Sequence, residues 1–246
     1  MLRNKIIFTI DVEPDLHTLK YRGIEQGLVV AEELFDKYNI KPVLFVTGDC
    51  IKKYPSTFKR LYRKGWEISS HGYTHRRFDE MSKHEKEKEI KKIIVVFKKY
   101  LGIKPKGFRA PQHSIDKETL NLLEKYGFKY DSSITPLNLL QLLFFPSKFL
   151  SWLKTFFSPL NPYKIRKDLV EIPTSALLLP FVSLIVRIFP PIFLKVYIFL
   201  IKLFYKNPVF YCHSWDFIEL PHSKIEKLFP YTKLIKNLEY VLKSEK

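Results

Sequence analysis

Residues 6–15 are IIFTIDVEPD, a short apolar run rich in β-branched and aromatic side chains that ends abruptly in acidic ones. An apolar run of this length with a polar boundary indicates a buried β-strand. Four more strand-like segments follow: VLFVT at 43–47, WEISS at 66–70, GFRA at 107–110 and PVFYCH at 208–213. Helical patterns separate the first four strands. Because alternating strands and helices normally build a parallel sheet or barrel, the sequence predicts an α/β fold.

The expected helices carry start and stop signals. Ser82 and Glu85 form a capping box in front of a long lysine-rich helix, and Gly102 is expected to end it. Asp116 can cap another helix, which should end before Gly127. The remaining helices are expected at 25–38, 55–64 and 223–243.

Composition sets the broad class of the protein. With 246 residues, of which 46% are hydrophobic and 27% charged, the chain can form a sizeable core, and we expect one domain over residues 1–246. Its two cysteines exclude a disulfide scaffold and a four-cysteine zinc site. The opening MLRNKIIFTIDVE reaches charged residues too soon for a signal peptide, which predicts a cytoplasmic protein.

The formal net charge of +17 favours anionic partners: nucleic acid, an anionic membrane surface or phosphorylated substrates. The lysines are scattered over many predicted helices, and no nucleic-acid-binding module is recognisable. We therefore do not expect nucleic acid as a partner.

Two stretches, 137–167 and 176–206, are the most apolar of the chain and are expected to be helical insertions in the domain. Lysines and prolines interrupt both, so neither is expected to span a membrane. In the second, Lys195, Lys202 and Lys206 share one helical stripe while apolar residues cover the remainder, as in helices at a membrane interface. This pattern predicts peripheral contact with the inner face of the membrane beside the functional site. The alternative is a helix packed on the barrel with solvated lysines.

Polar side chains collect where the predicted strands end, which is where α/β folds place their sites. Asp11 and Glu13 would share one face if the first strand continued through them, because side chains alternate along a strand. Two neighbouring carboxylates suit a division of labour in which one binds a metal and the other handles protons. The alternative is an acidic turn after a strand.

His71 and His75 follow the strand at 66–70 in the segment HGYTH. A spacing of four residues brings two imidazoles onto one face of a helical turn, where they can hold one metal ion. The alternative is a pair of exposed loop histidines. The chain has only seven histidines, and this scarcity favours the metal site.

Arg109 and His213 stand near the ends of two more predicted strands, in the segments RAP and YCHSW, and Asp131 stands in the segment YDSS after Gly127. The guanidinium of Arg109 can orient a carboxylate through two hydrogen bonds; otherwise it is a surface arginine before a rigid turn. A histidine at a strand end is usually structural, but beside a metal site His213 can serve as a general acid.

In order and rough spacing, the segments TIDVE, HGYTH, RAP and YCHSW resemble the motifs of the polysaccharide deacetylase family, the NodB-homology domains of carbohydrate esterase family 4. The resemblance covers about residues 5–135 and 168–220. It implies a distorted parallel (β/α) barrel of about seven strands, interrupted here by the apolar helical insertions.

The resemblance also implies a metal triad of Glu13, His71 and His75, with Zn²⁺ as the expected divalent ion. The first motif is the Asp-x-Glu variant, since Val12 stands where many members have a second aspartate. Whether Glu13 or Asp11 is the ligand therefore stays open.

Further roles follow from the resemblance. Asp11 would be the general base for the attacking water, and Arg109 would hold it in place. His213 would be the general acid for the departing amine, steadied by Asp131. Two more histidines could also approach the site, although neither is assigned a role: His17 and His113.

These assignments imply a metal-dependent hydrolase that removes an N-acyl group, expected to be acetyl, from an amino sugar. Because no export signal is expected and the insertions are apolar and basic, we expect the sugar on a lipid phosphate carrier or cell-envelope glycan precursor. Two alternatives remain. One is a deformylase of a formamido-sugar lipid; the other is a non-catalytic membrane-surface or sugar-binding protein on the same fold.

Overall fold

The computed structural model of the protein describes residues 5–15, 18, 20–140, 153 and 155–245. At its centre lies an eight-stranded sheet with the order β10-β1-β2-β3-β4-β5-β7-β6. Neighbouring strands run parallel except β6, which pairs antiparallel with β7. The strands are β1 (Ile7–Val12), β2 (Val43–Val46), β3 (Glu67–Ser70), β4 (Gly107–Phe108), β5 (Tyr130–Asp131), β6 (Tyr163–Lys164), β7 (Val170–Glu171) and β10 (Val209–His213).

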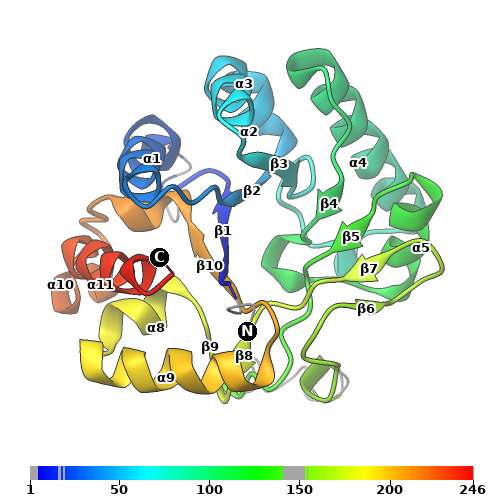
Figure 1. Cartoon of the computed structure of the whole chain (residues 1–246). Helices are drawn as coiled ribbons and strands as arrows, with labels where there is room; N and C mark the ends of the chain where they lie inside the picture. Colours follow the sequence, from blue (N-terminus) through cyan, green and yellow to red (C-terminus); the bar gives the residue numbers. More distant parts are fainter. Residues whose placement is uncertain (1–4, 16–17, 19, 141–152, 154, 246) are drawn as a thin grey trace.

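The sheet curves into a half-barrel, and helices surround it (Figure 1). The α-helices are α1 (Leu28–Lys37), α2 (Gly48–Lys53), α3 (Pro55–Arg63), α4 (Lys83–Val96), α5 (Lys117–Lys125), α8 (Ser183–Ile188), α9 (Pro191–Phe204), α10 (Lys224–Leu228) and α11 (Tyr231–Lys243). The shorter helical segments are η1 (Gly23–Gly27), η2 (Phe78–Glu80), η3 (Phe97–Leu101), η4 (Pro111–His113) and η6 (Ser214–Phe217). The predicted α/β barrel is confirmed. It has eight strands rather than about seven, since β6 adds an antiparallel edge strand.

A two-stranded hairpin, β8 (Ala176–Leu177) and β9 (Leu179–Pro180), lies beside β10. The Ser175 N–H donates to the Val209 carbonyl (3.1 Å). The Tyr211 N–H donates to the carbonyl of Phe181 (3.2 Å). These bonds extend the main sheet beyond β10 and curve it further toward a barrel.

Several local signals in the sequence are reproduced. Ser82 and Glu85 form the predicted capping box of α4, and the Asp116 side chain caps α5. Gly102 ends the π-helical turn after α4 in the left-handed region, with φ 74°. Two features differ from prediction: α2 was not expected, and the last helix is divided into α10 and α11. Pro230 lies at the division because it lacks the N–H that a continuous helix requires.

Side-chain alternation along β1 separates an apolar layer from a polar interior. Phe8 packs edge-on against Phe35 of α1, with ring centroids 5.4 Å apart. On the opposite face, Arg109 Nη1 donates to Thr9 Oγ1 (2.9 Å) and to Asp11 Oδ1 (2.7 Å). The interior of the half-barrel is thus polar along β1, and this polar strip leads toward the carboxyl end of the strand.

The apolar segment 176–206 forms the β8–β9 hairpin, α8 and α9. The carboxyl end of α9 lies at the start of β1, because Glu245 accepts from Lys202 of α9 and from the backbone N–H of Ile6. Asp11 lies at the other end of β1. The carboxyl end of α9 therefore lies at the opposite end of β1 from Asp11, and here the insertion does not lie beside the predicted site as expected.

Part of the other apolar segment, 137–167, falls outside the described residues, namely 141–152 and 154. Its described remainder includes β6. Among the helices that the structure describes, none combines the length and the apolar character needed to cross a bilayer.

Candidate functional site

The side chains predicted for the site come from separate strands and meet at one end of the sheet. β10, β1, β2, β3 and β4 are successive parallel neighbours, so their carboxyl ends share one edge. Asp11 lies in register with His213 on β10, His71 follows β3, and Arg109 follows β4. The parallel order thus gathers four motifs that are far apart in the sequence.

Glu13, His71 and His75 form a compact group in which one ligand atom from each lies within 4.8 Å of the others. His71 Nδ1 is 2.9 Å from the backbone carbonyl of Arg109. Since a carbonyl only accepts, Nδ1 carries the hydrogen and the lone pair is on Nε2. Nε2 lies 3.9 Å from Glu13 Oε2. Burial lowers the pKa of His71, which favours the neutral ring that binds metals.

The two histidines meet through a loop, and the predicted helical turn is absent from residues 71–77. Gly72 (φ 74°) and His75 (φ 57°) adopt left-handed backbone conformations that reverse the chain. Glu89 of α4 fixes this loop by accepting from the N–H groups of Tyr73 (3.2 Å) and Thr74 (3.1 Å). The imidazole centroids of His71 and His75 are consequently 5.2 Å apart.

The chemistry of this group fits a divalent metal. Oε2 of Glu13 is buried and accepts no hydrogen bond from the described part of the chain; it is in contact with His75 Nε2. Apart from that contact, the buried oxygen has no hydrogen-bond partner among the described residues, and a bound cation would compensate its charge. Two imidazoles and one carboxylate are a donor set that Zn²⁺ uses, with positions left open for other ligands.

Asp11 lies beside this group and is held by Arg109. The guanidinium is completely buried and lies over the Phe45 ring. It donates to Asp11 Oδ1 (2.7 Å). It also donates to the carbonyl (2.9 Å) and to Oγ (3.0 Å) of Ser132. Burial alone would raise the pKa of Asp11, but the charge of Arg109, with smaller contributions from nearby histidines, lowers it to about 2. The predicted contact of Arg109 with Asp11 is present, Asp11 is a carboxylate at neutral pH, and its Oδ2 lies 3.9 Å from His71 Nε2, as far as Glu13 Oε2 does.

His213 lies on the Glu13 side of the site, with its Nε2 3.8 Å from Glu13 Oε1. Its Nδ1 is 3.6 Å from Oδ2 of Asp216, which also accepts from the His213 backbone N–H (2.8 Å). Burial would lower the pKa of His213, but the carboxylate of Asp216 beside the ring raises it to about 9. The Trp215 ring stacks on the imidazole at 4.3 Å. His213 is therefore protonated at neutral pH and held in one orientation.

The structure gives Asp216 the position predicted for Asp131. Asp131 accepts from Ser133 Oγ (2.7 Å) and shares a hydrogen bond with Glu171. Burial, together with the neighbouring charge of Asp131, raises the pKa of Glu171 well above its usual range, so the proton of this pair resides on Glu171. Asp131 is completely buried and accepts hydrogen bonds from Ser133 in the segment after β5. The carboxylate that pairs with His213 comes instead from Asp216, in the turn that follows β10.

His113 also lies in the interior, whereas His17 falls outside the described residues. Nδ1 of His113 donates to the Ser133 carbonyl (2.9 Å), and its buried Nε2 makes no hydrogen bond with the described residues. Burial and the charge of Arg109 lower the pKa of His113 to about 4, so the ring is neutral. It can present an acceptor to the site.

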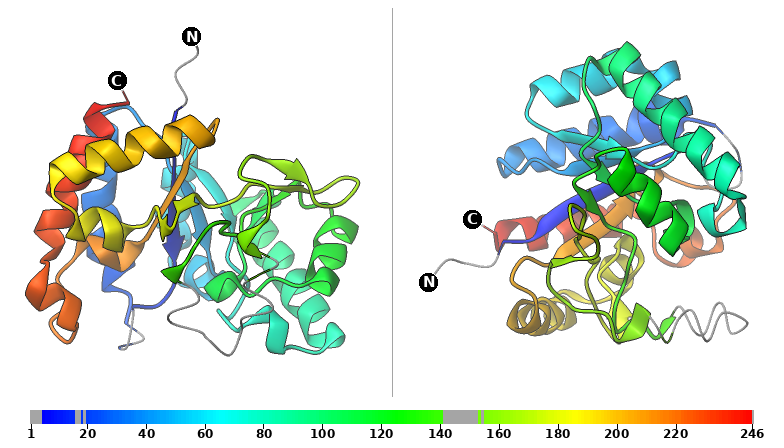
Figure 2. Two further views of the ribbon diagram at one scale, coloured as in Figure 1. Left: turned by 90° about the horizontal axis from the view of Figure 1, so that it is seen from below. Right: turned by 90° about the vertical axis from the view of Figure 1, so that its right-hand side faces the viewer.

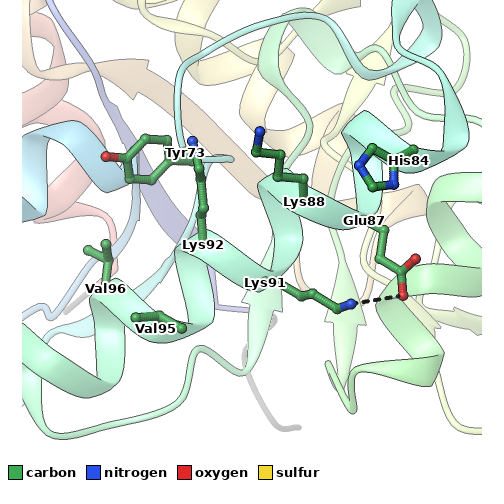
Figure 3. Close-up of a pocket in the computed structure, with 8 residues that line it drawn as sticks. All are labelled: Tyr73, His84, Glu87, Lys88, Lys91, Lys92, Val95 and Val96. Atoms are coloured by element: carbon green, nitrogen blue, oxygen red, sulfur yellow. Dashed lines mark ion pairs between the residues drawn. The ribbon is translucent and has the colours of Figure 1, made fainter.

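A separate surface groove of about 570 Å³ runs along α4 (Figure 3). Tyr73 and the lysines Lys88, Lys91 and Lys92 line it, and Lys91 pairs with Glu87 at 3.6 Å. None of the residues predicted for the site lines this groove. The candidate site at the strand ends is therefore separate from this groove.

Comparison with known proteins agrees with this arrangement. A family model described as polysaccharide deacetylase matches residues 3–130, just over half of the chain. The chain belongs to the polysaccharide deacetylase family. The matched region contains the site residues from Asp11 to Arg109, while His213 and Asp216 lie beyond it.

Two curated relatives match this member of the polysaccharide deacetylase family over 105 and 110 residues. A peptidoglycan deacetylase-like protein of Gibberella zeae is 32% identical over 105 residues, which are 42% of this chain and 31% of the relative. The peptidoglycan deacetylase of Helicobacter pylori is 32% identical over 110 residues, 45% of this chain and 38% of the relative. The match thus spans about a third of each relative's length.

Solved structures share the polysaccharide deacetylase fold over nearly the whole chain. A Mycobacterium smegmatis protein classed with the polysaccharide deacetylases has a TM-score of 0.68 at 18% identity, covering 97% of this chain and 83% of its own. A family pseudoenzyme from Bacillus anthracis has a TM-score of 0.55 at 13% identity, covering 97% and 62%. Because a pseudoenzyme shares the fold, the fold alone says nothing about activity.

Proposed function

We propose that this chain is a metal-dependent hydrolase that removes the N-acetyl group from an amino sugar. The observation that carries the proposal is the arrangement around Glu13, His71 and His75. This group could hold a divalent metal, and it is flanked by an ionised carboxylate, Asp11, and a protonated imidazole, His213. Amide hydrolysis needs an acceptor for the proton of water and a donor for the departing amine, and both are present.

The chain's own residues then have distinct roles. A divalent ion on the triad, when bound, acidifies water and polarises the acyl carbonyl. Asp11 is a weak base, since its pKa is about 2, and can accept a proton only from a water acidified in this way. Arg109 positions Asp11. His213 donates the proton that the amine needs to leave, and Asp216 keeps that proton available.

We further propose Zn²⁺ as the ion and an amino sugar on a lipid phosphate carrier as the substrate, met at the inner face of the membrane. The donor set of two imidazoles and one carboxylate supports zinc. The net charge of +17 supports a phosphorylated substrate. The relatives named as peptidoglycan deacetylases support an N-acetylated sugar as the substrate and acetyl, rather than formyl, as the group that is removed.

The test is release of acetate from N-acetylglucosaminyl lipid phosphates and from soluble N-acetylglucosamine oligomers, with formate measured in parallel on formamido-sugar lipids. Activity should disappear with a chelator and return with zinc. His71→Ala should be inactive, whereas the exposed His84→Ala should match the parent. Sugar binding without release of acetate or formate by the zinc-loaded parent would identify a non-catalytic member, and would overturn the proposal.

A further inference from the structure

The outward face of α9 is apolar although it meets solvent. Large hydrophobic side chains on this face keep between 52% and 65% of their surface accessible: Ile192, Phe193, Val196, Phe199, Leu203 and Phe204. The inward face is apolar as well and packs on the domain through buried side chains: Leu194, Tyr197, Ile198 and Ile201. A surface helix ordinarily turns polar residues outward, so the outward side chains, here called the α9 face, indicate a partner.

Two more exposed apolar side chains belong to segments that are bonded to one another and to the end of α9. The Leu139 N–H donates to the carbonyl of Leu178 (2.9 Å), and both side chains are exposed. The hairpin that carries Leu178 is tied to the end of α9, because the Tyr205 hydroxyl donates to the Ala176 carbonyl (2.9 Å). Seen from below, α9 (yellow-orange) runs along one edge of the molecule (Figure 2).

The segments that build the α9 face supply basic residues and no acidic ones; Glu245, which follows α11, pairs with Lys202 of α9. Residues 132–167 and 172–215 contain no Asp or Glu, although the whole chain has 25. Lys195 lies on α9 at the edge of the apolar stripe, and Lys206 follows its carboxyl end; both are exposed. Long lysine side chains at the border of an apolar face can reach phosphate groups while their neighbours stay in hydrocarbon.

This charge pattern selects between two possible occupants. In a symmetric dimer the same surface meets itself, so Lys195 and Lys206 would face like charges with no carboxylate from these segments to pair with. An anionic bilayer instead offers phosphates to the lysines and acyl chains to the aromatic and aliphatic groups.

We propose that the α9 face docks on an anionic lipid bilayer as a peripheral surface. Its apolar side chains enter the boundary between headgroups and acyl chains, and Lys195 and Lys206 lie at the phosphates. Docking needs none of the residues of the metal site, so this inference goes beyond the proposed hydrolase activity and stands or falls separately from it.

The test is flotation of the full-length chain with phosphatidylcholine vesicles that contain or lack phosphatidylglycerol, at low and high salt. The parent should float with the anionic vesicles, and high salt should weaken its binding. Lys195→Gln with Lys206→Gln should weaken binding about thirty-fold at low salt. The control pair Lys59→Gln with Lys98→Gln removes the same charge from exposed lysines of α3 and η3 and should leave binding unchanged.

A second pair of variants tests insertion of the apolar side chains. Phe199→Ser with Leu203→Ser should weaken binding by at least about tenfold. The matched control, Val95→Ser with Leu228→Ser, changes two exposed apolar residues elsewhere and should bind as the parent does. Circular dichroism verifies that each variant is folded.

Three results would overturn the docking proposal. The parent could fail to float at every salt concentration, or the Phe199 and Leu203 variant could bind as tightly as the parent. The third is a parent that sediments as a dimer without binding vesicles, with the dimer lost in that same variant; a second copy would then cover the face. His71→Ala should float like the parent. Flotation without acetate release would refute only the hydrolase proposal.

Discussion

Removing one ligand of the triad should abolish the stabilisation of this chain by zinc. Glu13, His71 and His75 each place a ligand atom within 4.8 Å of the others, whereas Asp11 is engaged by Arg109. Zinc that binds only the folded state adds about 4 kcal/mol of stability at a free concentration a thousand times its Kd. Each kcal/mol raises the Tm of a chain of this size by about 2–4 °C, so the parent should gain about 8–16 °C.

Calorimetry of metal-stripped protein with and without zinc measures this rise, and mass spectrometry counts the bound metal. His71→Ala and Glu13→Gln should each lose the rise, because two remaining ligands hold zinc weakly. Asp11→Asn and the exposed control His84→Ala should keep it. A rise that persists in both ligand variants refutes the triad. Loss in Asp11→Asn with retention in Glu13→Gln would transfer the ligand role to Asp11.

Three further predictions concern the residues around the triad. Asp216→Asn removes the carboxylate that raises the pKa of His213 to about 9. If the pKa of His213 returns to its ordinary value of about 6.5, the protonated fraction of His213 at about pH 8 falls about thirty-fold. The alkaline limb of the kcat/KM profile should then move toward neutral pH while the zinc content stays unchanged. An unmoved limb would contradict the role of His213. Glu171→Gln tests the shared proton. The pKa of Glu171 is raised on folding, so its contribution to stability is complete below its ordinary value of 4.5 and is lost as the pH rises toward its folded value. The unfolding free energy of the variant should therefore decline less than that of the parent above pH 4.5, and equal slopes in urea titrations would argue against the pair. Arg109→Met leaves Asp11 buried without its cation and should cost about 3–5 kcal/mol in urea denaturation; a loss below about 1 kcal/mol would show that the pair contributes little.

The sequence predicts the strand ends well because the polar residues that follow each buried run are local features. Asp11, His71, Arg109 and His213 all lie where their strands or the turns after them were expected. Their convergence could also be predicted, since parallel neighbours share a carboxyl edge. The strand order itself depends on long-range packing and has no local signal.

The strand order explains why Asp131 does not pair with His213 as predicted. Both follow strand ends, but β5 and β10 are separated in the sheet by β1, β2, β3 and β4. The carboxylate that pairs with His213 is Asp216, three residues further on in the same turn. A histidine followed by an aspartate at this spacing is the local signal that could have identified it.

The four-residue spacing of His71 and His75 is compatible with a helical turn and with a compact loop. Gly72 permits the loop, and Glu89 on α4 holds it by accepting backbone hydrogen bonds. The contribution of Glu89 depends on how α4 packs, which the local sequence does not specify. For α9 the difficulty was similar: both of its faces are apolar, so the sequence could not distinguish its packed side from its exposed side.

Arg109 connects the two halves of the proposed site. Its side chain donates to Asp11 and keeps that carboxylate ionised, while its backbone carbonyl accepts from Nδ1 of His71 and leaves Nε2 facing Glu13. The guanidinium is also anchored to Ser132, so the base and the ligand are fixed to one rigid group. A forked guanidinium can bind a carboxylate and a carbonyl from two separate segments at the same time. The Arg109 side chain thus sets the charge and position of Asp11, whereas the orientation of His71 depends on the backbone carbonyl at position 109 and not on the side chain there.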